Sequence, residues 1–315
     1  MIKALGAFLI SALISCILAP VVSKISKRLR AEQPILGYVE KHASKQGTPT
    51  MGGLTFVLAS IISALIFLPI GSQGVIAGLI MLSFAVIGFL DDYIKVHYKK
   101  NMGLRPYQKV IAQGAISVIV AIYAVKRLNV GALSLPFKLG ALELGVLALP
   151  FYVLVTVGTT NAVNLTDGLD GLASVTSVVA YTAFAVLCAL DGQTELTTFS
   201  VAVVGALAVF LVVNCFPAKI FMGDTGSLAL GGGLSALAIF SGKVAYLPLV
   251  GLPFVVSALS VIVQVTYFKL TKGKRVFIMA PFHHHLEGLG VHENKITFAY
   301  GLVSLIISVL VIMTS

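Results

Sequence analysis

Residues 75–92 read VIAGLIMLSFAVIGFLDD, an apolar run that ends in two adjacent carboxylates, Asp91 and Asp92. A helix that crosses about 30 Å of hydrocarbon needs roughly 20 mostly apolar residues. This stretch therefore predicts a transmembrane helix with acidic groups at one membrane surface. Similar apolar runs recur along the chain, and ten spans are predicted: 3–23, 51–70, 75–92, 109–126, 146–161, 171–190, 197–213, 227–241, 246–268 and 296–314.

The composition excludes a soluble globular protein, because 58% of the 315 residues are hydrophobic and only 11% are charged. We expect an all-α polytopic membrane protein with one membrane domain over residues 1–315. The first span is expected to be a retained helix rather than a cleaved signal peptide. Pro150 predicts a kink in the fifth span, and Pro248 and Pro253 predict one in the ninth. Residues 133–145 contain turn residues and partial alternation that predict a small β-hairpin.

The distribution of basic residues predicts how the protein lies in the membrane. With ten spans, 17 of the 22 Lys and Arg residues fall in loops on one face. The positive-inside rule places that face in the cytoplasm and both termini outside. The net charge of +10 needs no further explanation, and we expect no nucleic-acid partner.

Five polar clusters carry the residues that could perform chemistry. Two spans separate each cluster from the next, so all five are predicted to lie on the cytoplasmic face and to form one shared site. The clusters are Lys45–Gly53, Asp91–Lys95, Asn161–Gly171, Asn214–Ser227 and Pro281–Gly288.

The adjacent carboxylates of Asp91 and Asp92 repel each other and are predicted to face the negative end of a helix dipole. A cation is therefore expected beside them. One candidate is Lys95, one helical turn beyond Asp91, in an ordinary surface ion pair. The other is a divalent ion, because carboxylates at a membrane surface suit Mg²⁺, which shares its ligands with substrate phosphates.

Two further clusters combine carboxylates with glycines. Asn161, Asn164, Asp167 and Asp170 recur every third residue and predict a curved polar row, although Asn and Asp are also common turn and capping residues. Asp224 lies in Gly223–Ser227, just before the eighth span. Backbone N–H groups at a helix start favour a phosphate, and Asp224 is interpreted equally well as a metal ligand beside it or as an N-cap.

The histidines at positions 283–285 are consecutive, so on a helix they point about 100° apart. At most two can face a common ligand, which disfavours a three-histidine metal site. They could donate hydrogen bonds to phosphate or orient a carboxylate, or they could form a solvated run. Lys45 is interpreted either as a phosphate or nucleotide contact or as an ordinary positive-inside lysine.

Taken in order, the motifs GTPTMGG (47–53), LDDY (90–93), NAVNLTDGLDGLA (161–173), NCFPAKIFMGDTGS (214–227) and PFHHHLE (281–287) resemble those of the phospho-N-acetylmuramoyl-pentapeptide transferase family. The resemblance implies transfer of phospho-N-acetylmuramoyl-pentapeptide from UDP-N-acetylmuramoyl-pentapeptide to undecaprenyl phosphate, giving lipid I and UMP with Mg²⁺. It also implies a homodimer in the bacterial cytoplasmic membrane.

The resemblance further implies roles for individual residues. Asp91, Asp92 and Asp224 match catalytic carboxylates and metal ligands, Asp224 foremost, and His283 matches the essential histidine motif. Phe221 is placed to stack on uracil. The positions matched to substrate binding are Lys45, Lys95, Lys109, Asn164, Asp167, Asp170, Asn214, Phe221, Gln264, His284 and His285.

Two other functions compete with this interpretation. A sister enzyme that transfers N-acetylhexosamine 1-phosphate to a polyprenyl phosphate would share the acidic motifs, but the histidine cluster at 281–288 favours the muramoyl-pentapeptide branch. A secondary transporter or flippase predicts charged residues within the spans and inverted repeats. The interiors of the predicted spans lack Asp, Glu, Lys and Arg, which disfavours a transporter.

Overall fold

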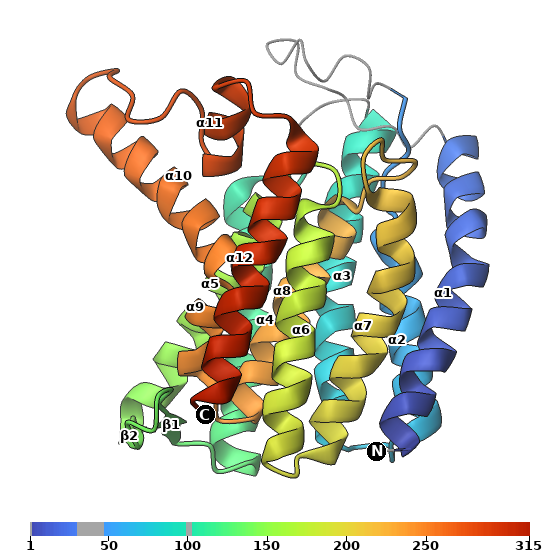
Figure 1. The fold of residues 1–315 in the computed structure, drawn as a ribbon, viewed down its shortest axis with the longest axis vertical. Coiled ribbons are helices and arrows are strands. Elements are labelled where there is room, and N and C mark those ends of the chain that lie inside the picture. The colour runs from blue at the N-terminus through green and yellow to red at the C-terminus, as the bar shows by residue number, and fades with distance from the viewer. Residues whose placement is uncertain (1, 30–46, 99–102) are drawn as a thin grey trace.

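The computed structural model describes residues 2–29, 47–98 and 103–315, which form a bundle of helices running between two ends (Figure 1). The helices are α1 (Ile2–Arg28), α2 (Gly53–Phe67), α3 (Gln73–Tyr98), α4 (Pro106–Arg127), α5 (Ala148–Thr166), α6 (Leu172–Leu190), α7 (Thr194–Asn214), α8 (Gly223–Phe240), α9 (Leu247–Val250), α10 (Leu252–Leu270), α11 (Phe282–Gly288) and α12 (Glu293–Met313), with short 3-10 turns η2 (Gly145–Leu147) and η3 (Val244–Tyr246).

The predicted all-α polytopic fold is confirmed. In the described part of the chain, eight helices are long and apolar enough to cross a membrane: α1, α3, α4, α5 with its preceding turn η2, α6, α7, α10 and α12. The two remaining predicted spans correspond to α2, with 15 residues, and α8, with 18 residues. Both chain ends lie at the end of the bundle opposite α11, as an even number of spans requires (Figure 1).

The ninth predicted span is broken, at the place where the prolines predicted a kink. Helix α9 ends at Val250 and α10 begins at Leu252, with Gly251 between them. Pro253 cannot donate a backbone hydrogen bond, so the helix does not continue straight through this point. After the break, α10 leans away from the bundle toward the end that carries α11 (Figure 1).

The predicted hairpin at the opposite end is also confirmed. Strand β1 (Ala132–Ser134) pairs antiparallel with β2 (Ala141–Glu143), and Leu133 lies opposite Leu142. The Ser134 N–H donates to the Gly242 carbonyl oxygen, 3.0 Å away, which joins the hairpin to the turn after α8.

Helix α8 occupies the centre of the bundle. All of its residues except Asp224 are buried. At Gly231 a Cβ atom would collide with the α5 backbone at Thr160, and at Gly232 and Gly233 it would collide with the side chains of Phe84 in α3 and Tyr181 in α6. This packing places Asp224, at the first turn of α8, in the middle of the bundle's polar end.

Helix α3 reaches the same place from the opposite direction. A Cβ on Gly88 would collide with the Asp224 backbone, so α3 touches the start of α8 one turn before Asp91. The sequence predicted that α3 ends at Asp92, but the helix continues to Tyr98. The expectation that the two carboxylates face a helix C-terminus is therefore wrong. The last turn of α3 lies beyond them and contains Lys95 and His97, which place basic groups at the negative end of the helix dipole.

Candidate active site

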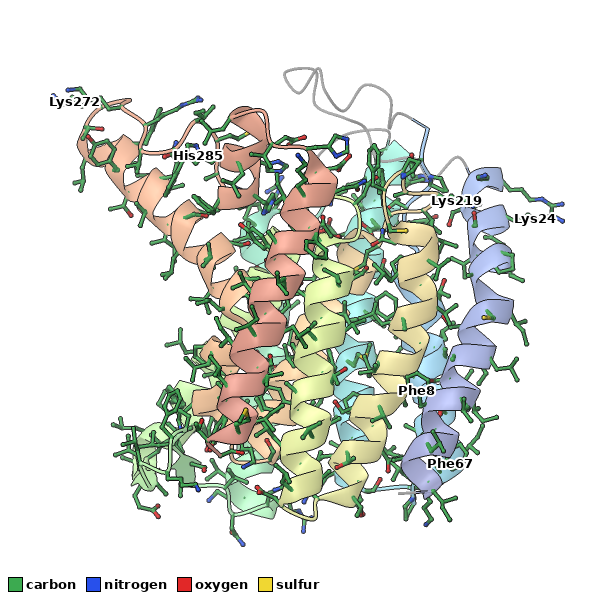
Figure 2. The ribbon with its side chains drawn as sticks, in the orientation of Figure 1. Phe8, Lys24, Phe67, Lys219, Lys272 and His285 are labelled. Atoms are coloured by element: carbon green, nitrogen blue, oxygen red, sulfur yellow. The ribbon has the colours of Figure 1, made fainter. Side chains whose placement is uncertain are left out.

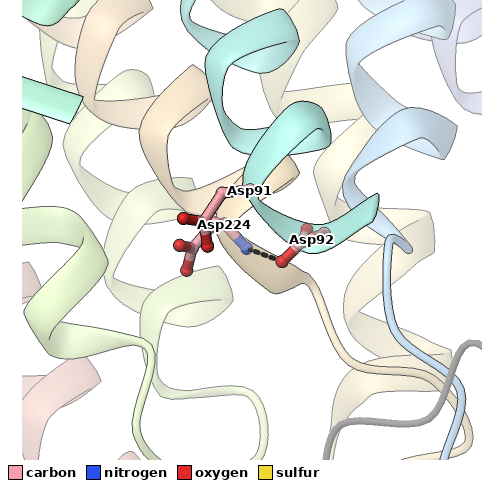
Figure 3. A group of neighbouring side chains, drawn as sticks. All are labelled: Asp91, Asp92 and Asp224. Atoms are coloured by element: carbon pink, nitrogen blue, oxygen red, sulfur yellow. Dashed lines mark hydrogen bonds between the residues drawn. The ribbon is translucent and has the colours of Figure 1, made fainter. Parts of the chain in front are cut away.

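Three carboxylates from two helices meet at the polar end of the bundle. Asp91 and Asp92 come from α3, and Asp224 comes from the first turn of α8 (Figure 3). One oxygen from each residue lies within 4.8 Å of the others. Asp91 and Asp92 are only 1% and 3% exposed, so water screens their repulsion poorly.

Two lysines offset most of this negative charge. Lys95 Nζ lies 2.6 Å from Asp91 Oδ2 and 3.1 Å from Asp224 Oδ2. Lys109 Nζ, from α4, lies 3.3 Å from Asp91 Oδ1 and also donates to Asp224 Oδ2. The predicted pair of Lys95 and Asp91 thus exists, but it belongs to a largely buried network and not to the surface. Among the residues that the structure describes, two ammonium groups face three carboxylates, and the remaining negative charge attracts a further cation.

Asp92 is held by the N-terminus of α8. Its Oδ1 accepts from the Asp224 backbone N–H at 3.1 Å, and its Oδ2 accepts from the Thr225 N–H at 2.9 Å and the Thr225 hydroxyl at 2.7 Å. The sequence predicted that these N–H groups would face a phosphate. In the structure a carboxylate of the chain takes that place, because α3 brings Asp92 there.

Gly223 makes this contact between α3 and α8 possible. It adopts a positive φ of 71°, and a Cβ at this position would collide with the Asp92 carboxylate and with Thr50. The other interpretation of Asp224, as an N-cap, is not observed, because α8 begins earlier than predicted and its N-cap is Met222.

Asn164 fixes the orientation of Asp224 from the side of α5. Its amide donates to Asp224 Oδ1 at 2.9 Å and to the Ser227 hydroxyl oxygen at 2.8 Å. Asn161, one turn earlier, donates instead to Gln113 Oε1 in α4 at 2.7 Å. The predicted polar row is therefore divided, because α5 ends at Thr166 and its members face different helices.

The rest of that row lies in the loop between α5 and α6. Asp170 Oδ2 accepts from the Ala218 N–H at 2.9 Å, which ties this loop to the one before α8. Neither Asp167 nor Asp170 caps α6, because its N-cap is Gly171, which makes no side-chain hydrogen bond. Burial, together with the negative charges of Asp224, Asp92 and Asp170, raises the pKa of Asp167 to about 8. The loop therefore lies in the same negative field as the three carboxylates.

The histidines of α11 face this loop. A Cβ on Gly168 would collide with His283 Nε2 and would touch His284 Nε2, so two of the three rings lie against it. His283 is fully buried, and neither ring nitrogen has a hydrogen-bond partner in the described part of the chain. Burial and the neighbouring His284 lower the pKa of His283 to about 3, which keeps the imidazole neutral. A neutral, unpartnered ring retains one donor and one acceptor for a ligand.

The other two histidines have partners within the chain. His284 Nδ1 lies 3.1 Å from Glu287 Oε2. His285 Nδ1 accepts from the Ile278 N–H at 3.2 Å and faces the segment between α10 and α11. The helical spacing predicted that at most two of the three rings could share a ligand, and the structure agrees with that limit.

Three more positions singled out by the resemblance bind neighbouring loops. Asn214 is buried, accepts from the Ser174 hydroxyl at 2.7 Å and donates to the Ile220 oxygen at 3.0 Å. Gln264 accepts from the N–H groups of residues 276 and 277 and donates to the oxygen of residue 277. Phe221, half-buried, joins the segment before α2 through backbone bonds to Pro49 and Gly52. Lys45 lies outside the described residues.

Sequence reasoning missed several groups that shape the site. The Leu104 N–H donates to Asp91 Oδ1 at 2.8 Å, and a Cβ on the neighbouring Gly103 would collide with the same carboxylate. A backbone donor has no signature in the side chains and could not be found from the sequence. Thr225 and Ser227 belong to a motif that was recognised, so their polar groups could have been proposed from position alone.

The carboxylates suit a hard divalent cation. All three candidate ligands offer oxygen, which Mg²⁺ prefers, and they combine a shared surplus of negative charge with close spacing. Within the described ranges, Asp92 Oδ1 receives one hydrogen bond of 3.1 Å and keeps a lone pair for a metal. Asp91, Asp92 and Asp224 therefore fit the metal that the sequence predicted.

Comparison with known proteins extends over almost the whole chain. A model of glycosyl transferase family 4 matches residues 74–242, and the signature 1 model of phospho-N-acetylmuramoyl-pentapeptide-transferase matches residues 45–57. Similar curated proteins carry the name phospho-N-acetylmuramoyl-pentapeptide-transferase. The protein of Clostridium botulinum (strain Eklund 17B / Type B) is 42% identical over 97% of this chain and 94% of its own length. That of Clostridium perfringens (strain 13 / Type A) is 41% identical over 96% of both, and that of Clostridioides difficile (strain 630) is 38% identical over 97% and 94%.

Proposed function

The chain belongs to the phospho-N-acetylmuramoyl-pentapeptide-transferase family, and we propose on that premise that it transfers phospho-N-acetylmuramoyl-pentapeptide from its UDP carrier to undecaprenyl phosphate. The products are lipid I and UMP. The protein is a multi-pass phospho-sugar transferase of the bacterial cytoplasmic membrane. The observation that carries the proposal is the meeting of three carboxylates and two lysines at the end of the membrane helices.

Transfer of a phosphoryl group requires positioning and charge neutralisation more than covalent chemistry from the protein. Lys95 and Lys109 supply two positive charges beside the carboxylates and are suited to bind the pyrophosphate of the UDP-sugar. When bound, Mg²⁺ would neutralise the charge that develops on the transferred phosphate. Asp91, Asp92 and Asp224 are the residues that would hold it, and Asp92 also fixes α8 against α3.

The loop between α5 and α6 is the proposed floor for the sugar-nucleotide. His283 and His284 lie on one side of this loop. Asp167 and Asp170 belong to the loop, and Asn164 lies in α5 just before it. Phe221 is proposed to stack on uracil. Asn214, Gln264 and His285 are proposed to support the substrate through the loops that they bind, and Lys45 is proposed as a direct phosphate contact.

The acceptor lipid requires a reaction centre at headgroup level, because its polyprenyl tail stays in the hydrocarbon. Asp91 and Asp92 meet that requirement, since the apolar part of α3 ends directly before them. The acceptor phosphate is proposed to approach from the membrane side of these carboxylates. A homodimer is proposed as the assembled form.

The test uses the purified chain in vesicles with UDP-N-acetylmuramoyl-pentapeptide, undecaprenyl phosphate and Mg²⁺. UMP and a lipid-linked sugar are expected in equal amounts, and omission of the acceptor or addition of EDTA should stop their formation. Preferential turnover of UDP-N-acetylglucosamine would assign the sister transferase activity instead. Cross-linking in the same vesicles tests the dimer, and a monomer alone would contradict that part of the proposal.

A further inference from the structure

A groove on the membrane-facing side of the bundle has no part in the proposed reaction. It lies at the end that carries the carboxylates and consists of two adjoining depressions, one of about 430 Å³ between α1 and α7 and one of about 530 Å³ lined by the last turns of α1. We call it the α1–α7 groove. Pro20 and Ser23 line both depressions; the first is otherwise mostly apolar, with Val209, Val212 and Val213 on the α7 side.

The rim of the groove is basic. Lys24, Lys27 and Arg28 line the second depression, and Lys219, from the loop before α8, lines the first. All four side chains are exposed, and Lys24 and Lys219 lie at the same end of the bundle (Figure 2). Within the described ranges, no carboxylate forms an ion pair with any of the four. Among the described residues, the four positive charges of the groove therefore have no partner carboxylate.

The depth of the groove corresponds to one leaflet. Cys16, at its deep end, precedes Lys24 by eight positions, or about 12 Å along the helix. One leaflet contributes roughly 15 Å of hydrocarbon. Beside Cys16, the Ser15 hydroxyl donates to the Ala206 oxygen at 2.9 Å, which joins α1 to α7 and closes the groove there. An acyl chain lying in the groove would place its headgroup among the basic side chains.

We propose that the α1–α7 groove binds one anionic glycerophospholipid, with its phosphate held by Lys24, Lys27, Arg28 and Lys219. Basic pockets between membrane helices at the cytoplasmic surface suit such headgroups. A second copy of the chain fits less well, because copies in a membrane share one orientation and two basic rims would face each other. The proposal does not depend on the transferase activity.

The chain has no tryptophan, which allows a site-specific probe. Val212→Trp places a single fluorophore in the groove, and Phe298→Trp on α12 places one outside it. Both native side chains are 72% exposed, so the two positions are matched in contact with lipid. The proteins are reconstituted in phosphatidylcholine with a minor fraction of phosphatidylglycerol, and only one of the two lipids carries brominated acyl chains, which quench tryptophan.

Brominated phosphatidylglycerol should quench the Val212→Trp protein at least about threefold more than its bulk fraction predicts, given the attraction of four basic residues. The Phe298→Trp protein should follow the bulk fraction. Changing Lys24, Lys27, Arg28 and Lys219 to Gln should return the Val212→Trp signal to the bulk value. The matched control changes the exposed Lys269, Lys272, Lys274 and Arg275 to Gln, which removes the same charge at the same end and should leave the enrichment intact.

Equal quenching at the two tryptophans would overturn the proposal, as would unchanged enrichment in the groove variant. Relief of the quenching by undecaprenyl phosphate at low concentration would show that the acceptor lipid occupies the groove, which also overturns it. Native mass spectrometry of the tryptophan-free chain gives an independent measurement. It should retain phosphatidylglycerol, and the groove variant alone should lose it.

Discussion

Replacing Asp92 with Asn separates the structural role of this carboxylate from its charge. The side chain accepts two backbone N–H groups and one hydroxyl at the start of α8. Hydrogen bonds to a charged group contribute about 1.5–3 kcal/mol each. Asn keeps one acceptor oxygen but turns an NH₂ group toward an N–H donor, and it gives up the favourable negative charge at a helix N-terminus. We expect Asp92→Asn to cost about 2–4 kcal/mol in stability.

Asp224→Asn is the matched control, because it removes the same charge from the same cluster. The Asn oxygen can still accept from Lys95, Lys109 or Asn164, and two carboxylates then face two lysines. The substitution weakens the charge-assisted bonds from Lys95 and Lys109 but relieves repulsion among the carboxylates, so its stability should fall by less than that of Asp92→Asn. Thr225→Val removes only the hydroxyl contact to Asp92 and should cost about 1 kcal/mol.

The assay is thermal unfolding in detergent with EDTA, so that no metal contributes. The apparent Tm of Asp92→Asn should fall by roughly 5–10 °C, while that of Asp224→Asn should fall by less. Both variants, and Asp91→Asn, should lose several orders of magnitude of UMP formation. Equal Tm values for Asp92→Asn and Asp224→Asn would refute the assignment of Asp92 as the link between α3 and α8.

Three further perturbations test other parts of the site. Lys109→Ala should tighten Mg²⁺ binding about tenfold, because it leaves more negative charge among the carboxylates, and it should lower turnover. Calorimetry without substrate measures the metal binding, and weaker binding would contradict this. Gly168→Val should displace His283 and lower kcat at least about tenfold, with Mg²⁺-dependent thermal protection unchanged; full activity would show that the ring does not need this position. The pKa of His283 is lowered to about 3, so below the unfolded value of about 6.5 the unfolded chain binds the extra proton. Stability should therefore fall as pH drops from 6.5 toward 3. His283→Gln should make the Tm less dependent on pH in this range, and an unchanged dependence would exclude His283 as its cause.

The helical frame could be predicted because its signals are local. Length and apolarity define each span, and Pro248 and Pro253 mark the break between α9 and α10. The turn residues of 133–145 predicted the hairpin. Counting spans placed Asp91 and Asp224 on the same face, which their convergence requires. None of these predictions needed knowledge of which helices touch.

The contacts within the site depend on packing, which has no local signature. DDYIK predicted the pair of Asp91 and Lys95, but nothing in it indicates that α3 continues to Tyr98, that Asp92 meets α8 or that Asp91 also meets Lys109. Lys109 was singled out only by resemblance, because a lysine at the start of a span usually reports membrane orientation. These partners became identifiable only from the crossing of α3, α4 and α8.

The seclusion of α8 has a consequence for biogenesis. The helix combines a carboxylate with a triple glycine, and it is not among the helices that reach the apolarity expected of an autonomous span. Such a segment partitions weakly into lipid by itself during synthesis. Its neighbours α3, α5 and α6 precede it along the chain, so the helices that pack around α8 are synthesised before it. Deletion of α3, α5 and α6, or translation of α8 behind an unrelated leader, should leave this segment outside the bilayer.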